Sequence, residues 1–306
     1  KSVGLYEWNY KGNSITENSL LKKVNDLIPD SRIQQLYFDN RQSVFISSSK
    51  GLVICNLLKN KVTVVQLPRN NPARTSVNYC MKINDTSFLT STSNSIYNIV
   101  LKDDDIRINS LACFDSLISP ENKNILVDDK RRLIYVMGNY GSILTTLSYE
   151  NNTFNFLWRK ELNRVVNSME RINDSLFWLS TSEGLLTFNA NTREVKKESI
   201  PILTNEPIYF QRRDKTGRWW IVQRSYLTLF NPLTEAIEER IFLSNKQSNQ
   251  FTLSAACVSL PDNKLLLGSS EGVALIDLDK RNEDNNAERI IIRNVFMNDI
   301  EKPGNT

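Results

Sequence analysis

Apolar and polar residues alternate in short runs along the whole chain. Runs such as SLFWLST (175–181) and LLTFNA (185–190) are rich in β-branched and aromatic residues, and clusters of Asn, Asp and Gly separate them. Alternation with a period of two residues is typical of β-strands joined by tight turns. Helical spacing persists only over residues 17–28, which the pattern leaves open between a helix and an outer strand with a long connection. The pattern predicts an all-β protein.

The same pattern returns at regular intervals. TSEGLLTFN (181–189) and SSEGVALID (269–277) match position by position in chemistry: small polar residues, Glu, Gly and an alternating apolar run closed by Asn or Asp. Seven such anchors, spaced 42–47 residues apart, are Gly4, Gly51, Ser95, Gly141, Gly184, Tyr226 and Gly272. A turn containing Asp precedes six of them by 10–12 residues, at Asp39, Asp85, Asp129, Asp174, Asp214 and Asp262. Two marks that stay in phase indicate an internal repeat.

Each repeat reads as four short strands. In the fifth repeat these are 165–172, 175–181, 185–190 and 194–200. A unit of this size cannot bury both of its faces alone, so it must stack on copies of itself. Radial stacking of four-stranded sheets is the β-propeller. We therefore predict a seven-bladed β-propeller built from four-stranded antiparallel blades.

The ends of the chain do not fit seven complete repeats. The anchor at Gly4 has no room before it for two inner strands, so the first repeat of the propeller (1–286) is incomplete. Either the two ends of the chain pair to close the ring, or the inner half of a blade lies upstream of residue 1. Residues 287–306 are accordingly either a ring-closing segment or the start of a following β-sandwich.

Composition excludes several kinds of chemistry. The 306 residues include no His, which removes Ser-His triads, His general bases and the usual zinc sites containing His. The net charge of +4 is mild, so nucleic-acid binding is not indicated, and no apolar run is long enough to cross a membrane. Cys55 and Cys257 lie in apolar alternation and are predicted to be small buried side chains. No cofactor motif and no spaced set of metal ligands occurs, so we expect neither.

The segment DSLFWLSTSEGLLTFNANT (174–192) resembles the repeat of the two-component regulator propeller family. That repeat has an Asp turn, a short strand with a Trp-containing pair, then Gly-Leu and an apolar run closed by Asp or Asn. Residues 262–280 and 39–61 follow the same plan, and 214–234 replaces Gly-Leu with Tyr226-Leu227. The tail at 287–303 resembles the start of the β-sandwich that follows the last propeller in this family.

The resemblance implies a function. Such propellers form the periplasmic sensor part of bacterial hybrid two-component systems, in which two propellers, a β-sandwich, a membrane helix and a histidine kinase follow one another. It implies a non-catalytic domain that binds an oligosaccharide or other small molecule and contacts the neighbouring propeller and the β-sandwich. It also implies a homodimeric receptor in which a change of packing is relayed to the kinase. The alternative from another class is a carbohydrate-active hydrolase or lyase on a propeller scaffold, since this fold hosts both.

Candidate ligand-binding residues lie in the loops between the second and third strands of each repeat. These loops converge on one face of a propeller, and loops carry function while repeated strands supply the scaffold. The candidates are Lys50, Asn94, Tyr140, Glu183, Arg224 and Glu271. Glu183 and Glu271 would be the pair for a glycosidase, although the repeat itself explains their shared position.

The stretch YFQRRDKTGRWWIVQR (209–224) is the most distinctive local composition. Arg binds carboxylate or sulfate groups and Trp stacks on sugars, so an acidic saccharide would suit it. However, Trp219 and Trp220 are adjacent on a strand and must point to opposite faces, so at least one is expected to pack between blades. Arg212 and Arg213 split between the faces in the same way.

Overall fold

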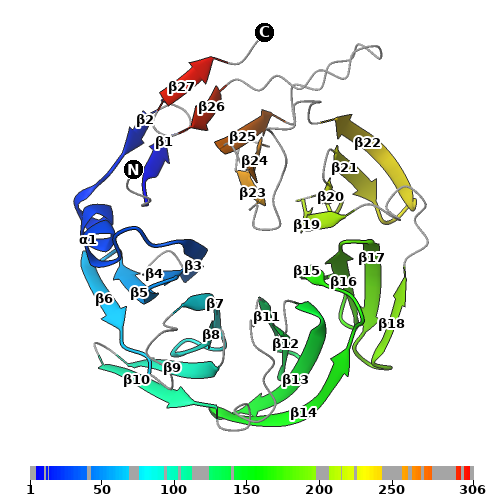
Figure 1. The fold of residues 1–306 in the computed structure, drawn as a ribbon. Coiled ribbons are helices and arrows are strands. Elements are labelled where there is room, and N and C mark those ends of the chain that lie inside the picture. Colours follow the sequence, from blue (N-terminus) through cyan, green and yellow to red (C-terminus); the bar gives the residue numbers. More distant parts are fainter. Residues whose placement is uncertain are drawn as a thin grey trace. The chain divides into compact units, whose positions relative to one another are not determined.

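The structure is a computed structural model, shown in Figure 1. It describes residues 5–9, 12, 14–39, 43–68, 76–92, 95–102, 105–111, 124–138, 141–197, 207–214, 216–223, 226–242, 257–260, 264–269, 272–277, 294–297 and 300–303. The chain divides into two compact units, residues 1–163 and residues 164–306.

The first unit contains a short hairpin, one described helix and three four-stranded antiparallel sheets (Figure 1). The hairpin is β1 (Glu7–Asn9) and β2 (Ser14–Thr16), and the helix is α1 (Ser19–Leu27). The first sheet is β3 (Ile33–Asp39), β4 (Ser43–Ser48), β5 (Gly51–Asn56) and β6 (Lys61–Val65). The second is β7 (Val77–Lys82), β8 (Ser87–Thr92), β9 (Ile96–Lys102) and β10 (Asp105–Ser110). The third is β11 (Asn124–Asp128), β12 (Leu133–Gly138), β13 (Ile143–Glu150) and β14 (Thr153–Glu161).

The second unit contains two four-stranded antiparallel sheets, a sheet with three described strands and a hairpin. The four-stranded sheets are β15 (Val166–Arg171), β16 (Leu176–Thr181), β17 (Gly184–Asn189) and β18 (Glu194–Lys197), then β19 (Ile208–Arg213), β20 (Trp219–Gln223), β21 (Tyr226–Asn231) and β22 (Ala236–Phe242). The three strands are β23 (Cys257–Leu260), β24 (Lys264–Ser269) and β25 (Gly272–Asp277), and the hairpin is β26 (Asn294–Met297) and β27 (Ile300–Pro303).

The four-strand reading of the repeat is confirmed. In each of the five four-stranded sheets the strands pair antiparallel with their neighbours in chain order. In each sheet the turns between first and second and between third and fourth strands lie at one end, called the 1–2 end below. The turn between second and third strands lies at the other, called the 2–3 end. The hairpin β26–β27 falls within residues 287–306, whose assignment to a sandwich or to ring closure stays a prediction.

A Ser or Thr hydroxyl builds the 2–3 turns. Thr181 Oγ1 donates to Gly184 O (2.7 Å) and accepts from Glu183 N (3.1 Å). Ser48 Oγ makes the corresponding bonds to Gly51 O and from Lys50 N, at 2.8 and 3.2 Å. The glycines at Gly51 and Gly184 have φ of 126° and 110°, a region that L-side chains rarely adopt. The Gly of the repeated anchor is therefore a backbone requirement of this turn.

Side-chain amides stabilise several turns at the 1–2 end. Asn173 Oδ1 accepts from the N–H groups of Ser175 and Leu176, both at 2.9 Å, and Asn84 caps its turn in the same way. In these two repeats the Asn before the marked Asp makes the turn, because an Asx side chain mimics a backbone carbonyl. Asn9 Oδ1 accepts from Gly12 N (3.0 Å), just as Asn56 Oδ1 accepts from Lys59 N (2.8 Å). The hairpin β1–β2 therefore matches the third and fourth strands of a repeat.

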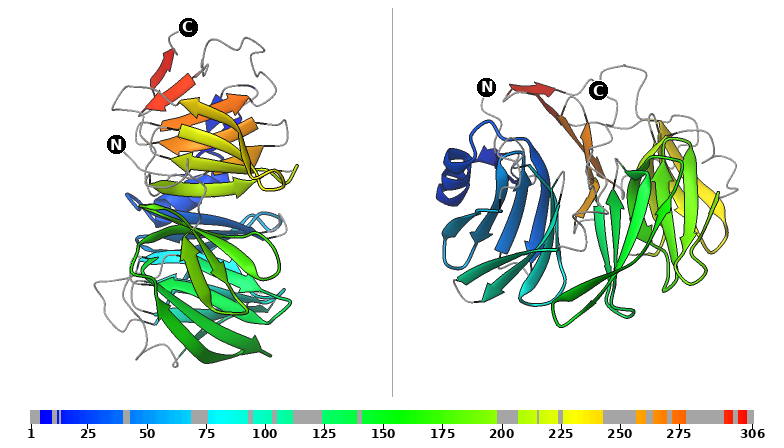
Figure 2. Two further views of the ribbon diagram at one scale, coloured as in Figure 1. Left: turned by 90° about the vertical axis from the view of Figure 1, so that its right-hand side faces the viewer. Right: turned by 60° about the horizontal axis from the view of Figure 1, so that its bottom comes forward.

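Residues 17–28, left open by the pattern, contain the helix α1. Asn18 caps it, since Asn18 Oδ1 accepts from Leu20 N and Leu21 N at 3.0 and 2.9 Å. The helix lies against the sheet β3–β6, as the right view of Figure 2 shows. Val24 and Ile28 are buried there with Ile46, Val53 and Cys55.

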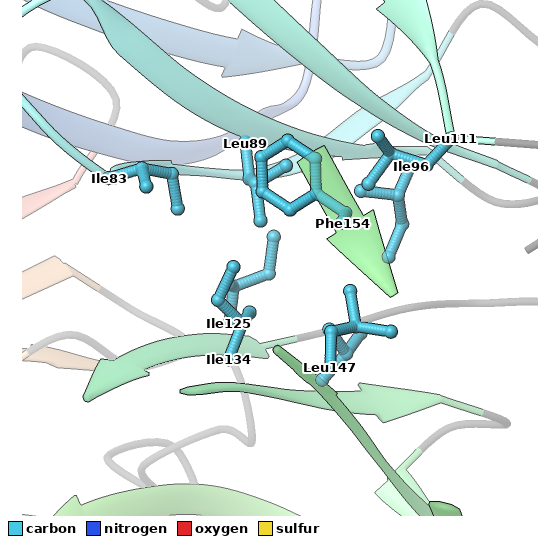
Figure 3. Packing of buried hydrophobic residues seen from close by; sticks show 9 residues of the cluster. Ile83, Leu89, Ile96, Leu111, Ile125, Ile134, Leu147 and Phe154 are labelled. Atoms are coloured by element: carbon cyan, nitrogen blue, oxygen red, sulfur yellow. The ribbon is translucent and has the colours of Figure 1, made fainter. Parts of the chain in front are cut away.

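Within each unit, apolar side chains fill the spaces between neighbouring sheets. Figure 3 shows the cluster between β7–β10 and β11–β14, in which Leu89 and Ile96 meet Ile134, Leu147 and Phe154. In the second unit, Trp219 packs with Trp178 at a ring-centroid distance of 4.9 Å, while Trp220 packs with residues of β24 and β25. The two tryptophan side chains thus pack on opposite faces of one sheet, as predicted.

Candidate functional site

Lys50 lies in the 2–3 turn of the first sheet. Its backbone N–H donates to Ser48 Oγ, and its ammonium group donates to the carbonyl of Pro29. Beside it, Ser49 Oγ accepts from Arg32 N at 3.0 Å. Lys50 is exposed, and its hydrogen bond to Pro29 links this turn to the segment that follows α1.

Glu183 occupies the corresponding turn of the sheet β15–β18. Its carboxylate accepts from the guanidinium of Arg164, the residue that leads into β15, and the Glu183 side chain is 60% exposed. This pair joins the 2–3 turn to the start of the first strand of the same sheet. Glu183 is thus neutralised by a neighbour and remains open to solvent.

Four further residues were predicted to line the same loops. Asn94, Tyr140, Arg224 and Glu271 lie outside the described residues, and so does Lys215 of the Arg-rich stretch. Lys50 belongs to the first unit and Glu183 to the second. The predicted convergence of the six side chains on one rim therefore stays a prediction.

A β-bulge marks the first strand of four sheets at the 2–3 end. In β15, Val166 pairs with Thr181 and Ser168 pairs with Ser180, which leaves Asn167 as the extra residue. The same irregularity occurs in β3, β7 and β19, where the extra residues are Gln34, Asn78 and Tyr209. Bulges re-aim side chains at the rims of barrels and beside active sites. No pattern in the sequence indicated these positions.

Side-chain amides connect the first strands of neighbouring sheets. Asn167 Nδ2 donates to Ile208 O of β19 at 2.8 Å, and Gln35 Oε1 accepts from Cys80 N of β7 at 2.6 Å. A first strand is the edge of its sheet, so its outward N–H and C=O groups have no ladder partner. Amides from the neighbouring strand supply that partner.

Charged pairs make similar connections at the 1–2 end. Lys82 of β7 donates to Asp39 of β3 at 2.9 Å and also pairs with Asp85 at 3.0 Å. The hydrogen bond to Asp39 raises the pKa of Lys82, so this lysine stays charged. In the second unit, Arg212 Nη1 of β19 lies 3.7 Å from Glu170 Oε1 of β15. Burial raises the pKa of Glu170 despite the attraction of Arg212.

The described cysteines are poor nucleophiles. Cys55 and Cys80 are buried free thiols, and burial raises their pKa to about 11 and about 12. They are protonated at neutral pH, and a thiol in that form does not attack or bind metals. The side chain of Cys257 and all of Cys113 lie outside the described part. Within that part, no group of three metal-binding side chains occurs.

The four-stranded antiparallel sheets and their likeness to solved structures define the class of protein: the chain is a β-propeller. No family model matches it, and no curated protein does. That the propeller has seven blades stays a prediction. No helix in the described ranges is long and apolar enough to cross a membrane.

Among solved structures, the chain is similar to the extracellular domain of the hybrid two-component system BT4673 from B. thetaiotaomicron. The TM-score is 0.63 at 16% identity, over 82% of this chain and 32% of that one. PorZ, a surface component of the type-IX secretion system of Porphyromonas gingivalis, gives a TM-score of 0.63 at 13% identity, over 89% and 44%. Virginiamycin B lyase from Staphylococcus aureus gives 0.59 at 12% identity, over 81% and 82%. The chain spans about a third of the two-component extracellular domain.

Proposed function

We propose that this chain is a non-catalytic, ligand-binding propeller of a periplasmic sensor in a hybrid two-component system. The observation that carries the proposal is the likeness in fold to the extracellular domain of such a system, of which it would be one part. The repeat in the sequence, with its Asp turn, Trp pair and Gly-Leu anchor, supports the same class. The ligand would be an oligosaccharide fragment or a related small molecule.

The charged groups of the candidate loops support binding rather than catalysis. A glycosidase needs two carboxyl groups roughly 5–10 Å apart, one of them with a raised pKa. Glu183 instead pairs with Arg164, and Glu170, whose pKa burial raises, lies at the opposite, 1–2 end of the same sheet, where it faces Arg212. Carboxylate–guanidinium pairs that are still open to solvent can exchange partners with a polar ligand.

The wider receptor would use this domain as one element of a relay. The neighbouring propeller, the β-sandwich and a second copy of the receptor would be its partners, and the kinase activity would reside in other parts of the protein. A ligand can shift packing between such domains only by its differential affinity for the two arrangements.

The experiment is a binding screen run beside a turnover assay on the same purified chain. Thermal unfolding is followed with neutral, uronic-acid and sulfated oligosaccharides. A ligand at a hundred times its Kd raises the free energy of unfolding by about 2.7 kcal/mol. Chromatography of each incubated oligosaccharide then tests for cleavage. We expect stabilisation by one class of oligosaccharide and no cleavage.

Variants separate the two functions. Glu183→Gln and Lys50→Gln are expected to weaken binding, while Glu194→Gln, on the outer strand β18, is the control with unchanged binding. Cleavage products that appear with the wild type and disappear in Glu183→Gln would establish the enzyme alternative. Absence of stabilisation by every oligosaccharide would contradict ligand sensing by this domain.

A further inference from the structure

We propose that Glu170 and Arg212 form a binding site for a small hydroxy acid at the 1–2 end of β15 and β19. The inference rests on the proposed function only in that the chain binds a polar small molecule; it adds the place and the chemistry. Neither residue belongs to the loops between second and third strands, where the sequence placed its candidates.

The two residues occupy equivalent positions on neighbouring strands. Glu170 pairs with Trp178 on β16, and Arg212 pairs with Trp220 on β20, and each is the fourth pair from the 2–3 turn. The strands β15 and β19 pack side by side within the second unit. The Glu170 carboxylate and the Arg212 guanidinium therefore lie close together where the first strands of two neighbouring sheets pack.

The pair is open. Glu170 Oε1 and Arg212 Nη1 are 3.7 Å apart, beyond hydrogen-bond distance, and the side chains are 31% and 50% exposed. The pair at the same end of the first unit differs: Lys82 and Asp39 are 2.9 Å apart, and each is 18% exposed. Within the described part, no donor is hydrogen-bonded to the Glu170 carboxylate. Among those residues, no donor competes with a ligand for its oxygens.

The surroundings make this carboxylate costly to leave without a hydrogen bond. Trp178, the cross-strand partner of Glu170, is buried against Trp219 and Phe230, so the neighbour of Glu170 on its sheet is part of an apolar cluster. Burial raises the pKa of Glu170, because the anion has lost solvent that Arg212 does not replace. A ligand hydroxyl that donates to the carboxylate would supply the missing interaction.

Two further arginines are the next residues along the strands, and their guanidinium groups lie elsewhere, that of Arg171 over the Phe177 ring. Arg171 and Arg213 follow Glu170 and Arg212 on the same strands, so these four residues carry three guanidinium groups and one carboxylate. Arg213 is exposed, its guanidinium lies over Gly217, and no carboxylate in the described ranges pairs with it. Because neighbours on a strand point to opposite faces, the guanidinium fork that would hold a ligand carboxylate here is that of Arg212.

These two requirements define the ligand class. Glu170 selects a hydroxyl donor, and Arg212 selects a carboxylate close to it. A sugar acid or another hydroxy acid presents both groups, whereas a neutral sugar lacks the carboxylate and acetate lacks the hydroxyl.

The test measures binding of D-glucuronate, D-glucose and acetate to the purified chain by calorimetry. We expect D-glucuronate to bind at least about tenfold more tightly than the other two, since one hydrogen bond to a charged group accounts for that factor. Glu170→Gln and Arg212→Gln should each lose that preference. Arg212→Lys keeps the charge but not the fork, and should lose most of it. Asp39→Asn, in the tight pair of the first unit, is the matched control and should bind as the wild type does.

Three results would overturn the site. The wild type could fail to prefer D-glucuronate, the variants could bind it as the wild type does, or Asp39→Asn could lose as much affinity as Arg212→Gln. If the variants bind D-glucuronate as the wild type does, the chain still binds a polar ligand. That result would support the proposed function and contradict this site. Unfolding of each variant without ligand shows that a loss of binding is not a loss of fold.

Discussion

Replacement of Asn98 by Leu should stabilise the protein. Asn98 lies on β9 and is only 1% exposed, and neither its amide nitrogen nor its amide oxygen has a partner among the described residues. It pairs with Leu89 and lies two residues from Ile96, both members of the apolar cluster in Figure 3. A polar amide therefore sits at the edge of an apolar core.

The size of the effect follows from these two unpaired groups. Leaving a buried donor or acceptor without a partner costs about 1–3 kcal/mol, whereas an apolar group of the same shape removes that cost. Leu has the same number and branching of side-chain heavy atoms as Asn, so the substitution opens no cavity. We expect Asn98→Leu to raise the free energy of unfolding by about 1–3 kcal/mol.

The assay is equilibrium unfolding in urea followed by circular dichroism. Asn98→Leu should move a midpoint to higher urea with an unchanged slope. Asn109, directly opposite Asn98 on β10 and exposed, supplies the control: Asn109→Leu should change stability by no more than about 0.5 kcal/mol. A loss of stability in Asn98→Leu that Asn109→Leu does not share would refute the reasoning.

Three further substitutions test the turns, the core and the partly buried acid Glu170. Gly51→Ala should cost about 1–3 kcal/mol in thermal unfolding, because φ is 126° while nothing lies within 4 Å of the new Cβ; an unchanged stability would mean that this turn relaxes. Trp219→Ala should cost about 3–5 kcal/mol in urea, and a loss near that of a surface substitution would contradict its place between two sheets. Burial raises the pKa of Glu170 above 4.5, so the stability linked to its proton is present below pH 4.5 and is lost as pH rises through the folded-state pKa. Stability of Glu170→Gln relative to the wild type should therefore grow from acidic to neutral pH, and a constant difference in urea titrations would contradict the shift.

The strands and their order could be predicted because the signals are local. In the fifth repeat, the expected runs 165–172, 175–181, 185–190 and 194–200 agree with β15 to β18 to within a few residues at each end. The Gly anchor could be recognised for the same reason, because a positive φ at a tight turn favours glycine at one fixed position. The helix α1 remained open because the helical spacing in residues 17–28 is short and also fits a strand and its connection.

The pair Glu170–Arg212 could not be predicted from the sequence, because only long-range contacts bring the two residues together. The stretch 209–224 drew attention to Arg212, but Glu170 lies 42 residues earlier in an ordinary-looking strand, and only the packing of β15 against β19 brings them together. The tie from Gln35 to Cys80 spans 45 residues and has no local signature either. Lys50 and Glu183, in contrast, were identified as loop residues, which is correct, but their partners Pro29 and Arg164 come from connections that the repeat does not describe.

Comparison of equivalent positions shows where the repeats have diverged. In the four sheets with a bulge, the fourth pair from the 2–3 turn has a large buried apolar residue on the second strand, which is Phe45, Leu89, Trp178 or Trp220. Its partner on the first strand varies: Tyr37, Met81, Glu170 and Arg212. The second-strand residue is needed by every sheet, because it fills the core between sheets. The first-strand residue is free to change at an edge, and in the second unit it has changed to two opposite charges on neighbouring strands. Specific chemistry in this fold is therefore best sought on the first strands.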